Sequence, residues 1–334
     1  MTSYVLGAGA SFHAGYPLCS ELWPRVVAWA IETDSEYRRA IEVVSALNGP
    51  VLDVEGFFTD LDQGRGVFRA LTEDKRRSLT ATIRSCVAAY FTSISRQGRG
   101  APLYEALSNR AAKGDVIVTF NYDVSLESEL IRARKFRVRN GYGGIEADWD
   151  ELDSEVTVLK PHGSINWIGR IFRGATHGSS HVRNAYGDRP FVDNKDSVLS
   201  GYPSDVLDKT FGRGGVAGGS DPGFVTLILP TYEKRFSAVT PLGNEWIAFY
   251  EKIWSDAAQS FERSDRIVVI GYSMPDADHH SRAVLLWNTN KRAEVFLFCR
   301  SDNERLQAQF RNHGFWRVRD MGSFEYFVSC LPAW

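Results

Sequence analysis

One histidine stands between a proline and a glycine, directly after a short apolar run. It is His162, in the stretch Val158-Leu-Lys-Pro-His-Gly-Ser-Ile-Asn-Trp167, and the apolar run before it spans 156–159. A lone histidine is more often structural than catalytic. A rigid turn at the end of a strand changes that expectation, because an imidazole held there can accept a proton near neutral pH. We therefore predict that His162 is a general base.

Two polar side chains follow another apolar run in the same way. Residues 116–119 predict a strand, and Asn121 and Asp123 come directly after it. Asp123 is also suited to cap the helix predicted over 124–134, because its carboxylate can accept from the first backbone N–H groups of that helix. Asn121 has no such structural role, so it is the stronger candidate for contact with a ligand.

A third polar turn follows the first apolar run, 3–6. Gly7-Ala8-Gly9-Ala10-Ser11 predicts a tight turn whose glycines let the backbone approach a phosphate, with a following helix aiming its first N–H groups at the anion. Phe12 stands where the dinucleotide fingerprint has its third glycine, and no acidic residue ends a second strand about 20 residues later. Taken alone, this turn is equally explained as a glycine connection between a strand and a helix.

The elements that must position these residues alternate along the chain. Further strands are predicted over 224–229, 266–270 and 294–298, with a closing strand over 324–330. Helices are predicted between them, notably over 246–261 and 303–312. This alternation predicts an α/β fold, a Rossmann-like doubly wound parallel sheet with a smaller helical insertion domain. In such a sheet, ligands bind outside the carboxyl ends of the strands, which is where all three polar turns lie.

We expect one domain over 1–334. Its sheet-forming core would comprise 1–19, 101–168 and 225–334. Residues 20–100 carry helical periodicity and predict the insertion. Residues 169–224 are rich in Gly, Asp, Arg and Ser, which predicts a long Gly-rich loop or lid. His177 and His181 in that segment, and His279 and His280 at a helix start, are interpreted as solvated side chains and not as a metal site.

Composition limits the classes of function. The 334 residues include 39 basic and 41 acidic residues, a formal net charge of −2, so no global basic footprint for nucleic acid is evident, although a balanced total can hide a local patch. No apolar run approaches the roughly 20 residues of a membrane helix, and no signal segment precedes the first strand. We expect a cytoplasmic protein that does not bind membranes.

The four cysteines are scattered along the chain. Cys19, Cys86, Cys299 and Cys330 form no closely spaced pair, so no structural zinc site and no other metal is predicted. Cys86 and Cys299 lie in apolar surroundings and are predicted to be core residues.

Taken together and in order, these motifs resemble the sirtuin superfamily, specifically the bacterial Sir2-like NAD-consuming proteins. The family's Gly-Ala-Gly-x-Ser loop matches 7–11, its Thr-x-Asn-x-Asp motif matches Thr119, Asn121 and Asp123, and its catalytic His-Gly matches 162–163. The bacterial branch adds a His-Gly-Ser-x-x-Trp continuation, matched by 162–167, a Pro-Thr-Tyr-Glu-Lys stretch, matched by 230–234, and a Gly-Tyr-Ser-x-Pro-x-x-Asp turn, matched by 271–278. The resemblance covers nearly the whole chain.

Two departures from the family pattern bear on activity. Deacylase sirtuins carry a four-cysteine zinc module, which this chain cannot form, and a Pro-Asp-Phe-Arg segment, where this chain has Pro17-Leu-Cys-Ser. Both departures argue against protein deacylation. The resemblance then implies an NAD+ glycohydrolase that makes nicotinamide and ADP-ribose, a class found in bacterial antiphage defence through abortive NAD depletion. It also implies a homo-oligomer or a partner protein such as a hexameric ATPase or an Argonaute-like protein.

The resemblance implies a role for each matched residue. His162 would be the general base, Asn121 would orient the attacking water or the ribose hydroxyls, and Asp123 would hold the nicotinamide ribose region. The remaining contacts with NAD+ would come from Gly7, Ala8, Gly9 and Ser11 at the pyrophosphate, from Thr119 and Gly163 within their motifs, and from Gly271 and Ser273 at the adenosine half. Residues 300–302 follow a strand end that could meet the adenine ribose.

Other functions remain open from the sequence. The same fold could be a non-catalytic NAD- or ADP-ribose-binding regulatory module of a defence complex, although a sensor needs no base such as His162. An NAD-dependent protein deacylase is a further alternative. A nuclease ranks last, because no carboxylate cluster is suited to two metal ions.

Overall fold

A six-stranded sheet forms the centre of the computed structural model, which describes residues 1–33, 37–48, 53–137, 141–142, 154–170, 181–184, 223–232, 244–275 and 278–329. The strand order is β3-β2-β1-β7-β8-β9, and every neighbouring pair is parallel. The strands are β1 Thr2–Leu6, β2 Val116–Thr119, β3 Thr157–Leu159, β7 Arg266–Ile270, β8 Glu294–Phe298 and β9 Val318–Asp320. The predicted α/β, Rossmann-like doubly wound sheet is confirmed.

The order of the strands fixes where a ligand can bind. Numbered along the chain, these six strands run 3-2-1-4-5-6, so the direction of winding reverses between β1 and β7. At such a switch point, the connections leave the two central strands in opposite directions and open a crevice at their carboxyl ends. Gly7 follows β1 and Gly271 follows β7, so two of the predicted turns flank this point.

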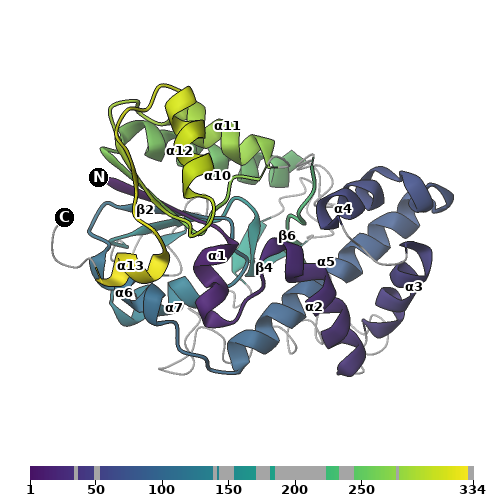
Figure 1. Ribbon diagram of the computed structural model, residues 1–334. Helices are drawn as coiled ribbons and strands as arrows, with labels where there is room; N and C mark the ends of the chain where they lie inside the picture. Colours follow the sequence, from purple (N-terminus) through teal and green to yellow (C-terminus); the bar gives the residue numbers. More distant parts are fainter. Residues whose placement is uncertain are drawn as a thin grey trace.

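The central strands are mostly apolar and rich in β-branched residues. In β7, 267–270 read Ile-Val-Val-Ile and are all buried, as are 117–119 in β2. Continuous apolar runs of this kind are typical of parallel strands covered on both faces. Helices cover both faces here: α10, α11 and α12 lie on one side and α6 and α7 on the other (Figure 1). The helices are α6 Pro102–Arg110, α7 Ser125–Arg132, α10 Asn244–Arg263, α11 His279–Asn288 and α12 Asn303–Asn312.

The helical insertion predicted after the first strand is present beside the sheet. It contains α2 Cys19–Glu32, α3 Arg38–Asn48, α4 Val54–Gln63 and α5 Glu73–Arg96, drawn at the right of Figure 1. Its core is aromatic, with the ring of Trp23 5.2 Å from that of Phe57 and 5.5 Å from that of Phe58. The Asp53 carboxylate accepts from Gly56 N and so caps α4. These aromatic residues belong to the same hydrophobic core as the strands of the main sheet.

A second, antiparallel sheet lies between the insertion and the main sheet. It has the order β5-β4-β6, with β4 Gly163–Arg170, β5 His181–Asn184 and β6 Gly223–Leu227. The segment 169–224, predicted as a loop, therefore contains a strand. Residues 171–180 and 185–222, on which the prediction of a lid depends, lie outside the described residues, and so does His177.

Two predicted elements are wrong. The closing strand over 324–330 is instead the helix α13 Phe324–Ser329, and the last strand of the sheet is β9, which precedes it. Phe324 and Phe327 are buried while Tyr326 is exposed, a helical spacing that the aromatic composition concealed. The helix expected after the first glycine turn is a single turn, α1 Ala8–Ser11, followed by the 3-10 helix η1 Phe12–Ala14. So short a helix contributes little dipole to an anion site.

Two smaller predictions can be checked directly. Cys86 and Cys299 are buried, as predicted, and burial raises the pKa of each thiol to about 12. Across the described ranges, no helix combines the length and the apolar character needed to cross a membrane.

Candidate active site

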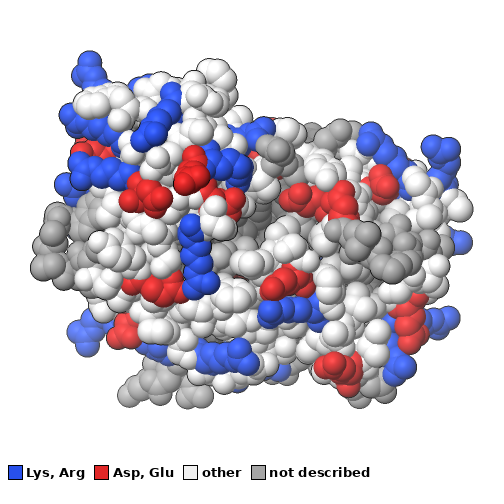
Figure 2. Space-filling model, viewed as in Figure 1, with Lys and Arg blue, Asp and Glu red and all other residues white. Residues whose placement is uncertain are grey.

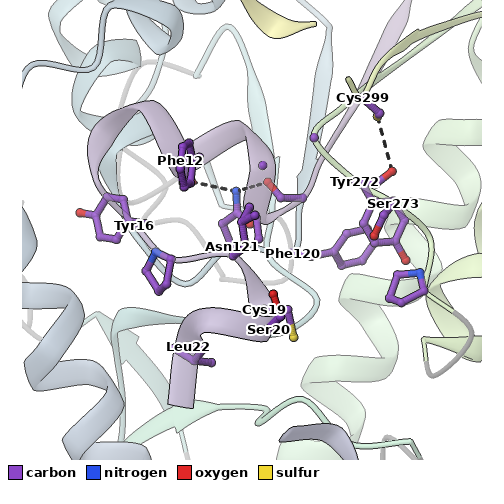
Figure 3. Close-up of a pocket in the computed structure, with 18 of the residues that line it drawn as sticks. Phe12, Tyr16, Cys19, Ser20, Leu22, Phe120, Asn121, Tyr272, Ser273 and Cys299 are labelled. Carbon is purple, nitrogen blue, oxygen red and sulfur yellow. Dashed lines mark hydrogen bonds between the residues drawn. The ribbon is translucent and has the colours of Figure 1, made fainter. Parts of the chain in front are cut away.

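A pocket of about 830 Å³ opens at the carboxyl edge of the main sheet, at the switch point. Figure 3 shows its lining, with Asn121, Phe120 and Tyr272 facing the space between the two central turns. Every residue predicted to be in the site lines this pocket except Thr119 and Gly163. The turns after β1, β2, β3, β7 and β8 all contribute, so segments far apart in sequence meet at one cavity.

The two glycine turns contact each other at the switch point. Gly9 N donates to Gly271 O at 2.9 Å, and Gly7 N donates to Ile270 O at 3.0 Å. A Cβ atom on Gly7 would lie 2.5 Å from Tyr272 Cα, and one on Gly271, whose φ is +58°, would lie 2.2 Å from Ala10 N. These glycines are therefore required for one turn to pack on the other. Their amides are already used within the protein, which the phosphate-cradle interpretation did not anticipate.

Asn121 anchors the first glycine turn. Its Nδ2 donates to Gly7 O at 2.8 Å and to Ser11 Oγ at 2.9 Å. Ser11 Oγ in turn donates to Asp123 Oδ2 at 2.6 Å and lies 2.6 Å from the Tyr104 hydroxyl. Burial raises the pKa of Tyr104 well above its usual value, so its phenol stays protonated and can donate to Ser11. The result is a closed polar cluster in which each side chain fixes the next.

Asp123 and the two residues outside the lining support this cluster. Asp123 Oδ1 accepts from Ser125 N, the first residue of α7, at 3.0 Å, although the N-cap position itself is Val124. Thr119 Oγ1 accepts from Asn121 N at 3.2 Å. Gly163 closes a tight turn, with its N donating to Lys160 O at 2.9 Å and a φ of +81°. Thr119 therefore lies behind Asn121, and Gly163 shapes the turn that carries His162.

His162 lies among aromatic rings. Its side chain is 10% exposed, and its ring centroid is 5.0 Å from that of Phe120 and 6.2 Å from that of Trp254. His162 Nε2 is 3.8 Å from a carboxylate oxygen of Asp278. An adjacent carboxylate stabilises the positive charge that an imidazole gains when it accepts a proton. This environment suits a base that is shielded from water until a ligand enters.

Asp278 is the residue that the sequence reasoning missed. It was matched as the last residue of the Gly-Tyr-Ser-x-Pro-x-x-Asp turn but was given no role. The Tyr272 hydroxyl donates to Asp278 Oδ2 at 2.7 Å, and the Ser281 hydroxyl donates to Oδ1. Burial, then the charge of Asp278, raises the pKa of Tyr272 well above its usual value, which keeps this donor protonated. Residues 276–277 of the turn lie outside the described residues.

A buried ion pair lies behind the site and was also missed. Lys160 and Glu127 are 0% and 1% exposed at their side chains, with Nζ 2.8 Å from Oε1. Lys160 Nζ also donates to the backbone carbonyl of Asp123, and the Tyr142 hydroxyl donates to Glu127 Oε1 at 2.9 Å. A lysine at the end of an apolar strand was the available signal. Lys160 therefore links the Asp123 turn to the turn that carries His162.

The helical insertion forms the opposite wall. Leu22, Glu55 and Phe91 line the pocket from α2, α4 and α5. The Tyr16 ring stacks on that of Phe91 at 5.3 Å, which ties the segment after η1 to α5. His280 is exposed, as predicted, and its ring lies 4.4 Å from that of Trp254. Across the described residues, no group of three His, Cys, Asp or Glu side chains could hold a metal ion.

The residues predicted at the adenosine half line the other end of the pocket. Gly271 and Ser273 follow β7, and Arg300 and Asp302 follow β8. Arg305 Nη2 donates to Ser273 O, and Arg305 Nη1 donates to Met274 O at 3.4 Å, so α12 holds the β7 turn in place. Arg300 forms an ion pair with Glu325 of α13 across the mouth of this end. Three charged residues and the turns after β7 and β8 thus define this end of the pocket.

Comparison with known proteins yields only distant similarities. No family model and no curated protein matches the chain. Solved structures that match include a Sir2 protein with a deacetylated p53 peptide and 3′-O-acetyl ADP ribose (11% identity, 98% of this chain and 91% of that chain, TM-score 0.41). Another is a complex of a Sir2 homologue with NAD (13% identity, 98% and 86%, TM-score 0.38). Identities and scores this low do not carry an activity from one chain to another.

Proposed function

We propose that this protein is an NAD+ glycohydrolase, an enzyme that hydrolyses NAD+ to nicotinamide and ADP-ribose. The observation that carries the proposal is the convergence of Asn121, Asp123 and His162 with two interlocked glycine turns around one pocket at the switch point of the sheet. The volume of about 830 Å³ is within the range of about 300–1,000 Å³ typical of small-molecule and cofactor sites.

The proposed substrate extends across the switch point. The pyrophosphate lies at the first glycine turn, where Ala8, the first residue of α1, has an amide without an acceptor inside the helix. The adenosine half lies toward Gly271 and Ser273. The nicotinamide ribose lies toward Asn121 and His162. With its Nδ2 committed to Gly7 and Ser11, Asn121 uses its carbonyl oxygen to accept from a ribose hydroxyl or from the attacking water.

The reaction breaks one bond and forms one. The bond between ribose C1′ and the pyridinium nitrogen breaks, and its electron pair leaves with nicotinamide, which becomes neutral. Positive charge develops on the ribose as an oxocarbenium-like centre, and water attacks C1′. His162 takes the proton that the water loses and passes it to solvent. Asp278 stabilises the imidazolium formed in this step, and the Asp123 carboxylate adds negative charge on the ribose side.

The preference for water over an acylated peptide rests on the sequence. The four cysteines cannot form the zinc module of deacylase sirtuins, and the Pro-Asp-Phe-Arg segment is replaced after Pro17. Two of the cysteines, Cys86 and Cys299, are buried at separate places in the core. A protein deacylase remains the second candidate within the same reaction class, because the same NAD+ bond breaks in both reactions.

The proposed setting follows from the family resemblance. A NAD+ glycohydrolase of this type would deplete NAD+ as an antiphage response, in the cytoplasm. We propose that it works as a homo-oligomer or with a partner protein such as a hexameric ATPase or an Argonaute-like protein. The trigger would act on the enzyme through that assembly.

Product analysis tests the reaction. The purified chain is incubated with NAD+ in H₂¹⁸O, with and without an acetylated peptide, and the products are separated by mass spectrometry. Hydrolysis predicts ¹⁸O-labelled ADP-ribose and no change when the peptide is added. O-acyl-ADP-ribose that appears only with the peptide would replace the proposal with deacylation. Calorimetric binding of NAD+ with no product in either reaction would favour a regulatory binding module.

A further inference from the structure

The two most exposed large apolar side chains of the described residues share one corner of the molecule. Trp287 is 72% exposed and Trp316 is 67% exposed. The ring of Trp287, at the end of α11, meets the ring of His313 edge-on at 5.4 Å, and Trp316 follows three residues later. Trp side chains are highly buried on average, so two neighbouring indoles with this exposure require an explanation.

Basic side chains surround these rings. Residues 287–293 and 311–319 contain Lys291, Arg292, Arg311, Arg317 and Arg319 but no acidic residue, in a chain whose formal net charge is −2. Blue side chains lie at the upper left of Figure 2, where Figure 1 places α12, with some red side chains among them. The Arg317 guanidinium lies over the Trp316 ring at 4.2 Å. The balanced total charge therefore conceals a local basic patch, which we call the Trp287–Trp316 corner.

Local structure accounts for only part of this patch. Cations are favoured at helix C-termini, and Lys291 donates to Leu286 O at the end of α11 while it lies over the Phe315 ring at 4.2 Å. Arg319 pairs with Glu294 at 3.3 Å. Arg292 and Arg311 form no ion pair within the described residues. Neither helix capping nor ion pairing accounts for two exposed indoles.

The chemistry of the corner selects one kind of occupant. Its most exposed apolar groups are the two indole rings, at 72% and 67%, whereas Met1, which lies on the same amino edge of the sheet beyond Asp265, is 42% exposed. Protein interfaces are also enriched in Trp and Arg, but their aromatic anchors fill well-packed pockets. Ring faces interleaved with arginines are suited instead to stacked bases and backbone phosphates. A second copy of the same corner would be repelled by its like charge.

We infer that the Trp287–Trp316 corner binds single-stranded nucleic acid, with bases stacked on the two indoles and phosphates paired with Arg292, Arg311 and Arg317. The corner is formed by the loops before β8 and β9, at the amino ends of the strands, while the pocket lies at their carboxyl ends. A bound strand would therefore leave the pocket open. This inference does not depend on the reaction proposed above.

Fluorescence anisotropy of a labelled oligothymidine of about 16 nucleotides tests the inference with the full chain. Trp287→Ala and Trp316→Ala should each weaken binding roughly 5- to 150-fold. Tyr326→Ala, which removes an exposed aromatic from α13 at the other edge of the sheet, should leave the affinity unchanged. Arg311→Ala should lower the slope of log affinity against log salt by about 0.7, the loss of one phosphate contact to a single strand.

Phenylalanine variants guard against a folding artefact. Trp287→Phe with Trp316→Phe keeps two stacking faces, so most of the affinity should remain while the quenching of intrinsic tryptophan fluorescence by the oligonucleotide falls. Three results would overturn the inference. They are no anisotropy change at low salt, binding unchanged in a variant that combines Trp287→Ala with Trp316→Ala, and displacement of the oligonucleotide by a polyglutamate peptide at matched charge. Displacement by polyglutamate would indicate a surface that recognises negative charge alone, as binding of an acidic protein partner would require.

Discussion

The two sides of the pocket are built in opposite ways. On the Asn121 side, the amide, the Ser11 hydroxyl, the Tyr104 phenol and the Asp123 carboxylate are joined by hydrogen bonds of 2.6–2.9 Å. On the other side, His162 packs on aromatic rings, and its nearest carboxylate, Asp278, is 3.8 Å away. The first side is fully assembled without a ligand. The second has room for a shorter contact to form when charge develops.

This difference gives the two sides of the pocket different roles, a fixed geometry on the Asn121 side and a base that becomes charged on the His162 side. A closed polar cluster holds a substrate in one geometry, which lowers the entropic part of the barrier. A shielded base beside a carboxylate gains most when it becomes charged, which is a contribution made in the transition state. We therefore expect the Asn121 side to contribute to both stability and activity, and the His162 side to contribute mainly to activity.

Alanine substitutions at Asn121 and His162 compare the two sides directly. Asn121→Ala leaves Gly7 O without its buried side-chain donor, at a cost of about 1–3 kcal/mol in the free energy of unfolding. The same change also abolishes the positioning of the ribose hydroxyl or the attacking water. His162→Ala should lower kcat by about 10²–10⁴-fold with little loss of stability. Urea unfolding and turnover are measured for both variants. Equal stability losses in the two variants would remove the distinction.

The buried ion pair behind both sides is the next largest effect. Lys160→Met leaves the Glu127 charge buried, so the free energy of unfolding should fall by about 3–5 kcal/mol. The double variant Lys160→Met with Glu127→Gln removes both charges and should recover much of the stability, while kcat stays low because the Asp123 carbonyl has lost its donor.

An exposed pair provides the control for that experiment. Arg77 and Glu73 on α5 are 67% and 64% exposed, and Arg77→Met should change stability by less than about 1 kcal/mol. Full recovery of activity in the Lys160 and Glu127 double variant would show that the pair contributes to folding alone.

Asp278→Asn tests the carboxylate beside His162. The amide keeps the shape and still accepts from Tyr272 but carries no charge, so kcat should fall by about 10- to 100-fold while the KM for NAD+ changes little. Tyr272→Phe, which removes one donor to the carboxylate, is the matched milder change. A rise in KM with unchanged kcat would assign Asp278 to ligand binding and not to the support of His162.

Much of the fold could be predicted from local pattern. The bounds of β2 and β7 follow from β-branched runs, and those of β8 from a run of Val, Phe and Leu, each typical of a strand covered on both faces. The segment 324–330 was wrongly predicted as a strand because Phe, Tyr and Val favour strands. The burial of Phe324 and Phe327 follows a helical spacing instead. β9 was missed because its Val-Arg-Asp sequence is short and charged.

The site was harder to predict, because its key contacts join residues far apart in sequence. Asn121 meets Gly7 across 114 positions, and the side chain of Ser11 meets that of Asp123 across 112. Motif order could place these residues at strand ends, but it could not pair them. The contact between His162 and Asp278 depends on β3 and β7 lying on opposite sides of the switch point, which spacing alone does not reveal.

The smallest expected effect is on the pH dependence of the free energy of unfolding. Burial lowers the pKa of His13, which lines the pocket, and of His280, which packs on Trp254. With these lowered pKa values, the folded state binds fewer protons than the unfolded state. The contribution of the two neutral histidines to the free energy of unfolding is therefore complete above their unfolded pKa of about 6.5. It is lost as the pH falls from that value toward the folded pKa. Urea unfolding should show stability falling below about pH 6.5, with a shallower fall in His13→Gln with His280→Gln. An unchanged slope in that variant would assign the acid sensitivity to other groups.

The most direct test of the account is release of nicotinamide and ADP-ribose from NAD+ by the purified chain, beside Asn121→Ala and His162→Ala. We expect equal amounts of the two products from the wild-type protein, none above background from Asn121→Ala, and a rate at least about 100-fold lower from His162→Ala, which remains folded. Product release that persists at the wild-type rate in both variants would contradict the account, because the pocket between the two glycine turns would then not be where the bond breaks.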